Sequence, residues 1–121
     1  MARILIADDD VILTEMLRFR LEALRHEVII APDGMAAIEA LEKEPVDLVV
    51  LDSMMPVVAG PEVLARIKSD PATAQIPVVM LTARKSESDV LAALKGGVDE
   101  YLTKPFIPQE LLFRIAKLLG R

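Results

Sequence analysis

The chain has 121 residues, of which 53% are hydrophobic, and a formal net charge of −5. This length fits a single compact domain, expected to span residues 1–121, with enough apolar residues for a real core. The absence of cysteine excludes disulfides, thiolate metal sites and a thiol nucleophile. The acidic balance and the 3% aromatic content argue against direct nucleic-acid binding.

The first strand is predicted at 4–7, a short continuous apolar run typical of a buried parallel strand. Because Asp8 ends this run, it is too short for a signal sequence or a membrane span. The next segment carries apolar residues at helical spacing, which predict a helix whose apolar face is formed by Ile12, Met16, Phe19 and Leu24, with Leu13 and Leu17 beside them. A second strand is predicted at 28–31, and the turn residues 32–34 precede a second helix.

The third strand is predicted at 48–51 and ends in Asp52, and Pro61 suits the first turn of the third helix. The fourth strand, 77–81, ends at Thr82. Ser86 and Ser88 are alternative caps for the fourth helix, which stops at glycines 96–97. A weaker strand at 100–103 precedes the last helix. Five strand–helix units at roughly twenty-residue spacing predict an α/β fold with a doubly wound parallel sheet.

Polar residues interrupt the apolar runs where four of the predicted strands end: Asp8, Asp9, Asp52, Thr82 and Lys104. In open α/β sheets, ligands bind at the carboxyl ends of the strands, so these side chains are expected to converge on one small pocket. Three clustered carboxylates are unfavourable unless a cation neutralises them, and hard oxygen ligands suit Mg²⁺. Such a site can bring a phosphoryl group to a carboxylate nucleophile, with the lysine offsetting its charge.

Four segments in this order and spacing, 4–10, 51–60, 81–83 and 101–106, resemble the signature blocks of receiver domains of bacterial two-component response regulators. The resemblance covers essentially the whole chain. It implies a (βα)5 domain with a five-stranded parallel sheet of flavodoxin-like strand order 2-1-3-4-5. It also implies a cytoplasmic signalling module that promotes its own phosphorylation and dephosphorylation without being a turnover enzyme.

The resemblance implies roles for the acidic residues. Asp52 is expected to accept a phosphoryl group from a sensor histidine kinase, a phosphotransfer protein or a small phosphodonor. Asp9 and Asp52 are expected to bind Mg²⁺ directly together with the main-chain carbonyl of Met54, while Asp8 acts through a bound water. Asp10, the third acid of the first cluster, is interpreted as a helix cap.

The resemblance also implies how the remaining site residues act. Lys104 pairs with the phosphoryl oxygens, and the Lys104–Pro105 bond is expected to be cis, which costs little before proline. Thr82 is expected to move and hydrogen-bond the phosphoryl group, and Tyr101 to turn inward behind it. This two-state change would reshape the face of the fourth helix, fifth strand and fifth helix, which controls a downstream effector protein or domain.

Several features depart from the family pattern. Val57, Val58 and Ala59 make the loop after Asp52 more apolar than in many relatives, and Ser53 stands where leucine or isoleucine is frequent. The fourth helix carries apolar residues at 90–93 where basic ones are usual. These apolar residues leave open whether the chain forms a homodimer on activation. Arg114 is still expected to pair with residue 99 or 100.

Two other functions stay open. One is a protein-interaction module of the same fold that works without phosphorylation. The other is a small phosphohydrolase with an aspartate nucleophile, although such enzymes usually carry a second acid two residues after the nucleophile, where this chain has Met54. His26, the single histidine, lacks a partner constellation for phosphorelay or metal binding and is interpreted as structural.

Overall fold

The computed structural model of the protein describes residues 1–83 and 86–120. In these residues, strands and helices alternate along the chain, as the apolar runs and helical periodicities predict. The elements are β1 (Arg3–Ala7), α1 (Val11–Ala23), β2 (Glu27–Ala31), α2 (Gly34–Lys43), β3 (Leu48–Asp52), α3 (Gly60–Ser69), β4 (Val78–Thr82), α4 (Glu87–Gly96), β5 (Glu100–Thr103) and α5 (Pro108–Leu118).

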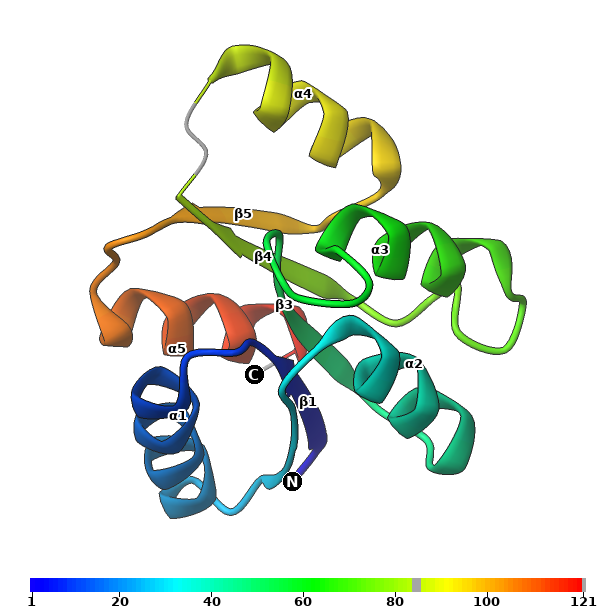
Figure 1. The fold of residues 1–121 in the computed structure, drawn as a ribbon. Helices are drawn as coiled ribbons and strands as arrows, with labels where there is room; N and C mark the ends of the chain where they lie inside the picture. Colours follow the sequence, from blue (N-terminus) through cyan, green and yellow to red (C-terminus); the bar gives the residue numbers. More distant parts are fainter. Residues whose placement is uncertain (84–85, 121) are drawn as a thin grey trace.

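The strands form one parallel sheet in the order β2-β1-β3-β4-β5, which confirms the predicted topology. Helices α1 and α5 cover one face of the sheet, and α2, α3 and α4 cover the other (Figure 1). The chain places β2 on one side of β1, and then places β3, β4 and β5 in turn on the other side. The carboxyl ends of β1 and β3 therefore adjoin at the point where the strand order reverses.

The alternation of side chains along β3 shows how one short strand serves both faces. Leu48 and Val50 belong to the core under α1 and α5, whereas Val49 and Leu51 belong to the core under α2, α3 and α4. All four are fully buried, which explains why this strand reads as a continuous apolar run in the sequence.

Helix α1 corrects one sequence interpretation. Ile12 and Phe19, expected on the apolar face, are 84% and 77% exposed, and Leu24, which lies just after the helix, is 58% exposed. The buried residues of the helix are Thr14, Leu17 and Leu21, which recur at spacings of three and four. Because α1 has apolar residues on two adjacent stripes, periodicity alone does not show which stripe packs on the sheet.

Side chains cap three of the described helices, α1, α2 and α4. Asp10 accepts a hydrogen bond from the Leu13 N–H at 3.1 Å, confirming its predicted capping role. Ser86, not Ser88, caps α4, since its hydroxyl accepts from the Asp89 N–H at 3.2 Å. At the other end of α4, Gly97 takes φ 102°, a left-handed conformation that glycine adopts at low cost. Among the residues described, no helix is long and apolar enough to cross a membrane.

Candidate functional site

The carboxyl edge of the sheet gathers the side chains that the sequence places at strand ends. Asp8 follows β1, Asp52 is the last residue of β3, Thr82 is the last residue of β4, and Lys104 follows β5. Asp8, Asp52 and Thr82 are all buried, with 2%, 4% and 0% of their surface exposed. A buried acid is costly unless it is paired or solvated, so each of these carboxylates requires a partner.

Lys104 provides that partner by reaching back across the sheet. Its Nζ lies 3.0 Å from Asp8 Oδ2 and 3.6 Å from Asp52 Oδ1, so one ammonium contacts both buried acids. Burial lowers the pKa of Lys104, but the hydrogen bond to Asp8 and the charges of Asp8 and Asp52 outweigh it and leave that pKa raised. The lysine is therefore a fixed positive charge at neutral pH.

The Lys104–Pro105 peptide bond is cis, as predicted.

The three acids form a compact group of oxygen ligands. Asp8, Asp9 and Asp52 each offer one carboxylate oxygen, and these oxygens lie within 4.8 Å of one another. Asp8 also accepts a hydrogen bond from the Asp10 N–H at 2.9 Å, which fixes its carboxylate. Asp9 is exposed, so the group opens to solvent on its side. Hard oxygen donors at an open edge fit Mg²⁺, which retains several of its waters.

The pKa of Asp52 is raised, first by burial and then by the negative charge of Asp8, with a smaller contribution from Asp9. The positive charge of Lys104 and the hydrogen bond from the Met54 N–H act in the opposite direction but do not cancel the effect. A bound cation would favour the ionised carboxylate, because an opposite charge stabilises the charged form.

Met54 contributes its main chain to the site. Its N–H donates to Asp52 Oδ1 at 3.3 Å, while the residue as a whole is 54% exposed. Its carbonyl as a metal ligand stays a prediction. Because Met54 occupies the position two residues after Asp52, the second acid that an aspartate-nucleophile phosphohydrolase uses is not there.

The loop after β3 folds back tightly on the strand. The Gly60 N–H donates to the Ser53 carbonyl at 3.1 Å, and a Cβ at Gly60 would lie 2.3 Å from the Asp52 carbonyl oxygen. Val57 has φ 70°, an unfavourable conformation for a β-branched residue. Val58 is buried against α2, where a Cβ at Gly34 would lie 2.0 Å from its carbonyl oxygen.

Ser53 is a site residue whose role the sequence did not reveal. Its hydroxyl donates a hydrogen bond to Thr82 Oγ1, and it is only 7% exposed. The pairing follows from the sheet register, since Asp52 pairs with Leu81 and the next residues along the two parallel strands are Ser53 and Thr82. A hydroxyl residue directly after Asp52 is visible in the sequence, but its hydrogen-bond partner depends on the register of the sheet.

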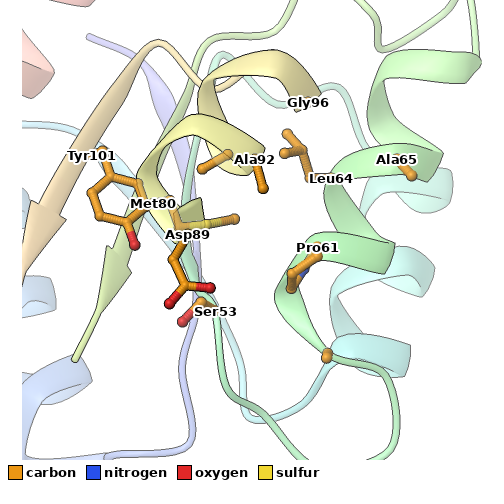
Figure 2. Close-up of a pocket in the computed structure, with 11 residues that line it drawn as sticks. Ser53, Pro61, Leu64, Ala65, Met80, Asp89, Ala92, Gly96 and Tyr101 are labelled. Atoms are coloured by element: carbon orange, nitrogen blue, oxygen red, sulfur yellow. The ribbon is translucent and has the colours of Figure 1, made fainter. Parts of the chain in front are cut away.

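Ser53 also lines a cavity of about 310 Å³ between α3 and α4. Figure 2 shows Tyr101 from β5, Asp89 from α4 and Pro61 and Leu64 from α3 around it. Tyr101 is half-buried and packs against the core on this face of the sheet. Its inward switch stays a prediction.

Arg114 of α5 pairs with Glu100 of β5, one of the two predicted partners, and with Glu110 at 3.1 Å. Asp99, the other predicted partner, instead accepts a hydrogen bond from the Val78 N–H at 2.8 Å. His26 lies just before β2, at the amino edge of the sheet, where its Nδ1 accepts from the Ala2 N–H at 3.1 Å. This contact agrees with a structural role for the histidine.

Known proteins of one family resemble this chain in sequence. The family model described as "Response regulator receiver domain" matches residues 4–116. The chain is 44% identical over 121 residues to the transcriptional regulatory protein CpxR of Escherichia coli, covering 100% of the chain and 50% of that protein. It is 40% identical over 119 residues to the phosphate regulon transcriptional regulatory protein PhoB of Escherichia coli, covering 98% and 52%. The chain thus spans about half the length of these curated relatives.

Solved structures agree with the sequence comparisons. The receiver domain of the Francisella response regulator 1452 superposes with a TM-score of 0.92 at 31% identity, covering 100% of this chain and 98% of that one. The receiver domain of the sensor histidine kinase PA1611 from Pseudomonas aeruginosa PAO1, solved with magnesium in its active site cleft, has a TM-score of 0.88 at 26% identity, covering 99% and 98%.

Proposed function

Because the chain belongs to the response regulator receiver domain family, we propose that Asp52 is its phosphoacceptor and that Asp8, Asp9, Lys104 and Thr82 support the transfer. The observation that carries the proposal is the contact of Lys104 Nζ with both Asp8 and Asp52 beside a third acid. This arrangement places fixed positive charge next to the carboxylate where a phosphoryl group would add negative charge.

Asp52 acts as the nucleophile. The Met54 N–H and Lys104 Nζ both approach its Oδ1, so Oδ2 is the proposed attacking atom. The bond from Oδ2 to phosphorus forms while the bond from phosphorus to the donor's leaving atom breaks, and its electron pair departs with the leaving group. The product is an acyl phosphate on Asp52, with the phosphoryl oxygens beside Lys104.

Asp9, Asp52 and the Met54 carbonyl are proposed to hold Mg²⁺ directly, with Asp8 acting through a water. When bound, the ion supplies positive charge to the phosphoryl oxygens during transfer. The donor set supports this assignment because three carboxylate oxygens meet within 4.8 Å at an edge open to solvent. Thr82 is proposed to donate its hydroxyl to the phosphoryl group, and Tyr101 to turn inward as Thr82 moves.

The partners follow from this chemistry. A sensor histidine kinase or a phosphotransfer protein in the cytoplasm is the proposed donor, and an effector domain or protein is the proposed receiver of the signal. The output surface is the face of α4, β5 and α5, where Leu91 and Leu94 of α4 are about half exposed, at 49% and 50%. We propose that the domain, 1–121, is a signalling phosphoacceptor rather than a turnover enzyme, without direct contact to nucleic acid.

The test is incubation with Mg²⁺ and acetyl phosphate, followed by intact-protein mass spectrometry and peptide mapping. The expected result is the added mass of one phosphoryl group on the peptide that contains Asp52, its loss in Asp52→Asn, and its retention in the exposed control Asp70→Asn. Labelling of a different aspartate would contradict the proposal. Sustained release of phosphate from organic monoesters would instead favour a hydrolase.

A further inference from the structure

Ser53 and Thr82 form a buried pair of hydroxyls beside the phosphoacceptor. The Ser53 hydroxyl donates to Thr82 Oγ1, and the two residues are 7% and 0% exposed. The main chain of Ser53 is held on both sides: its N–H donates to the Leu81 carbonyl at 2.9 Å, and its carbonyl accepts from the Gly60 N–H at 3.1 Å. The main chain of Ser53 is therefore held in place, and its hydroxyl donates a hydrogen bond to Thr82 from a fixed position.

The pair lies on the opposite side of the sheet from the contacts of Asp52. Successive side chains of a strand alternate between faces, so Ser53 lies on the face of α3 and α4, where it lines the cavity, and Asp52 lies on the other face, toward Lys104. Thr82 shares the face of Ser53, because Asp52 and Leu81 are paired in register. While it accepts from Ser53, the Thr82 hydroxyl is engaged by a contact on this face of the sheet.

We propose that Ser53 is a positioning residue that holds Thr82 in the resting conformation, so that Thr82 exchanges its hydrogen bond from Ser53 for one to the phosphoryl group when the domain is activated. This inference rests on the proposed roles of Asp52 and Thr82. Breaking a buried hydrogen bond opposes activation, because the hydroxyl left behind must find another partner.

The cavity beside Ser53 lowers the cost of the exchange. Ser53 lines this space of about 310 Å³ together with the polar residues Asp89 and Tyr101 (Figure 2). A serine hydroxyl rotates about one bond, and a mainly apolar cavity of this size has room for a water that Asp89 and Tyr101 can hydrogen-bond. The released hydroxyl can therefore turn into the cavity and be solvated, which limits the cost of leaving Thr82 to a fraction of a full desolvation penalty.

The test measures the affinity for beryllofluoride, a mimic of the acyl phosphate, at saturating Mg²⁺ by ¹⁹F NMR. The variant Ser53→Ala removes the restraint and is expected to bind beryllofluoride about two- to tenfold more tightly than wild type, the range expected for one net hydrogen bond. Ser53→Cys, which retains a side chain of similar size but donates weakly, is expected to shift the affinity in the same direction. The Ser53→Cys variant replaces Ser53→Ala in this test if the alanine variant does not fold.

Three comparisons separate positioning from a structural effect. In a Thr82→Ala background, Ser53→Ala is expected to change the affinity by less than about twofold, because the partner is gone. Ser53→Thr restores the hydroxyl and should return the affinity toward that of wild type. Ser69→Ala removes an exposed hydroxyl that donates to the Arg66 carbonyl at 3.2 Å and should leave the affinity unchanged.

Equal or weaker binding by Ser53→Ala overturns the inference, as does an equal gain in affinity with and without Thr82. If wild type itself binds no beryllofluoride and takes no phosphate on Asp52, the proposed function fails instead. If wild type binds and the serine variants bind no more tightly, only the role of Ser53 fails.

Discussion

Asp52 is the proposed phosphoacceptor, and its surroundings disfavour its charge. Burial and the neighbouring charge of Asp8 raise its pKa, and Lys104 only partly compensates. The same features suit this carboxylate to the proposed cation and phosphoryl group, because added positive charge would relieve the repulsion among the acids. The proposed function therefore has a cost in stability.

We expect Asp52→Asn to be more stable than wild type at neutral pH in the presence of EDTA. A carboxyl whose pKa is higher in the folded than in the unfolded protein destabilises the fold once pH exceeds both values. The gain should shrink as pH falls through the raised pKa toward the ordinary value of 3.8 and vanish below it. Thermal unfolding of both proteins as a function of pH measures this difference; a gain that grows in acid would contradict it.

A second prediction at this scale concerns Val57, which has φ 70° and is 75% exposed. Its left-handed conformation costs a β-branched residue about 1–2 kcal/mol, somewhat more than the chain entropy that glycine adds. Val57→Gly should therefore raise the free energy of unfolding by up to about 1 kcal/mol, measured by urea titration.

Ala59→Gly is the matched control, since Ala59 has φ −74° and loses no strain on substitution. We expect this control to be neutral or slightly less stable than wild type. Equal effects at the two positions would show that the conformation of Val57 carries no cost.

At the scale of elements, α4 is the helix held least firmly by packing. Of its ten residues, all described, only Ala93 is buried, and its inner side borders the cavity between α3 and α4. Its two ends are defined instead by local interactions, the Ser86 cap and the left-handed Gly97. A helix with few buried side chains is suited to shift its position at small cost.

Ser86→Ala should destabilise the domain by about 1 kcal/mol, because the alanine leaves the Asp89 N–H without its capping acceptor. Ser88→Ala, on the exposed first turn, should change the stability by less than about 0.5 kcal/mol. Chemical denaturation compares the two variants, and hydrogen exchange of α4 amides shows where the loss occurs. Similar losses in both variants would argue against Ser86 as the cap.

At the scale of the whole molecule, the acidic group joins residues that come from distant parts of the chain. Asp8 and Asp9 follow β1, Asp52 ends β3, and Lys104 follows β5, so they meet only in the folded sheet. A ligand of this group binds the native state and not the unfolded chain. Binding therefore stabilises the complete fold.

Addition of Mg²⁺ should raise the melting temperature of the wild-type domain, by the equivalent of ~2.7 kcal/mol at a concentration 100 times the Kd. Asp9→Asn should lose most of this increase without losing the fold, since Asp9 is exposed. Glu39→Gln, an exposed acid on α2, serves as the control and should respond as wild type does. The same increase in all three proteins would argue against a specific site.

The amino-acid sequence by itself determined the five strand–helix units, the parallel sheet and the acids at the strand ends. It could do so because buried strands require continuous apolar runs, and because a polar residue that ends such a run must lie at the edge of the sheet. The identity of Asp8, Asp9, Asp52, Thr82 and Lys104 as site candidates followed from that rule and from the family resemblance together.

Only the tertiary structure decided which stripe of α1 is buried, that Lys104 contacts both Asp8 and Asp52, and that Ser53 donates to Thr82. Each of these depends on contacts between residues far apart in the chain. Helical periodicity shows that α1 has apolar stripes but not which one meets the sheet. A hydroxyl next to Asp52 is visible in the sequence, but the register of β3 against β4 sets its partner.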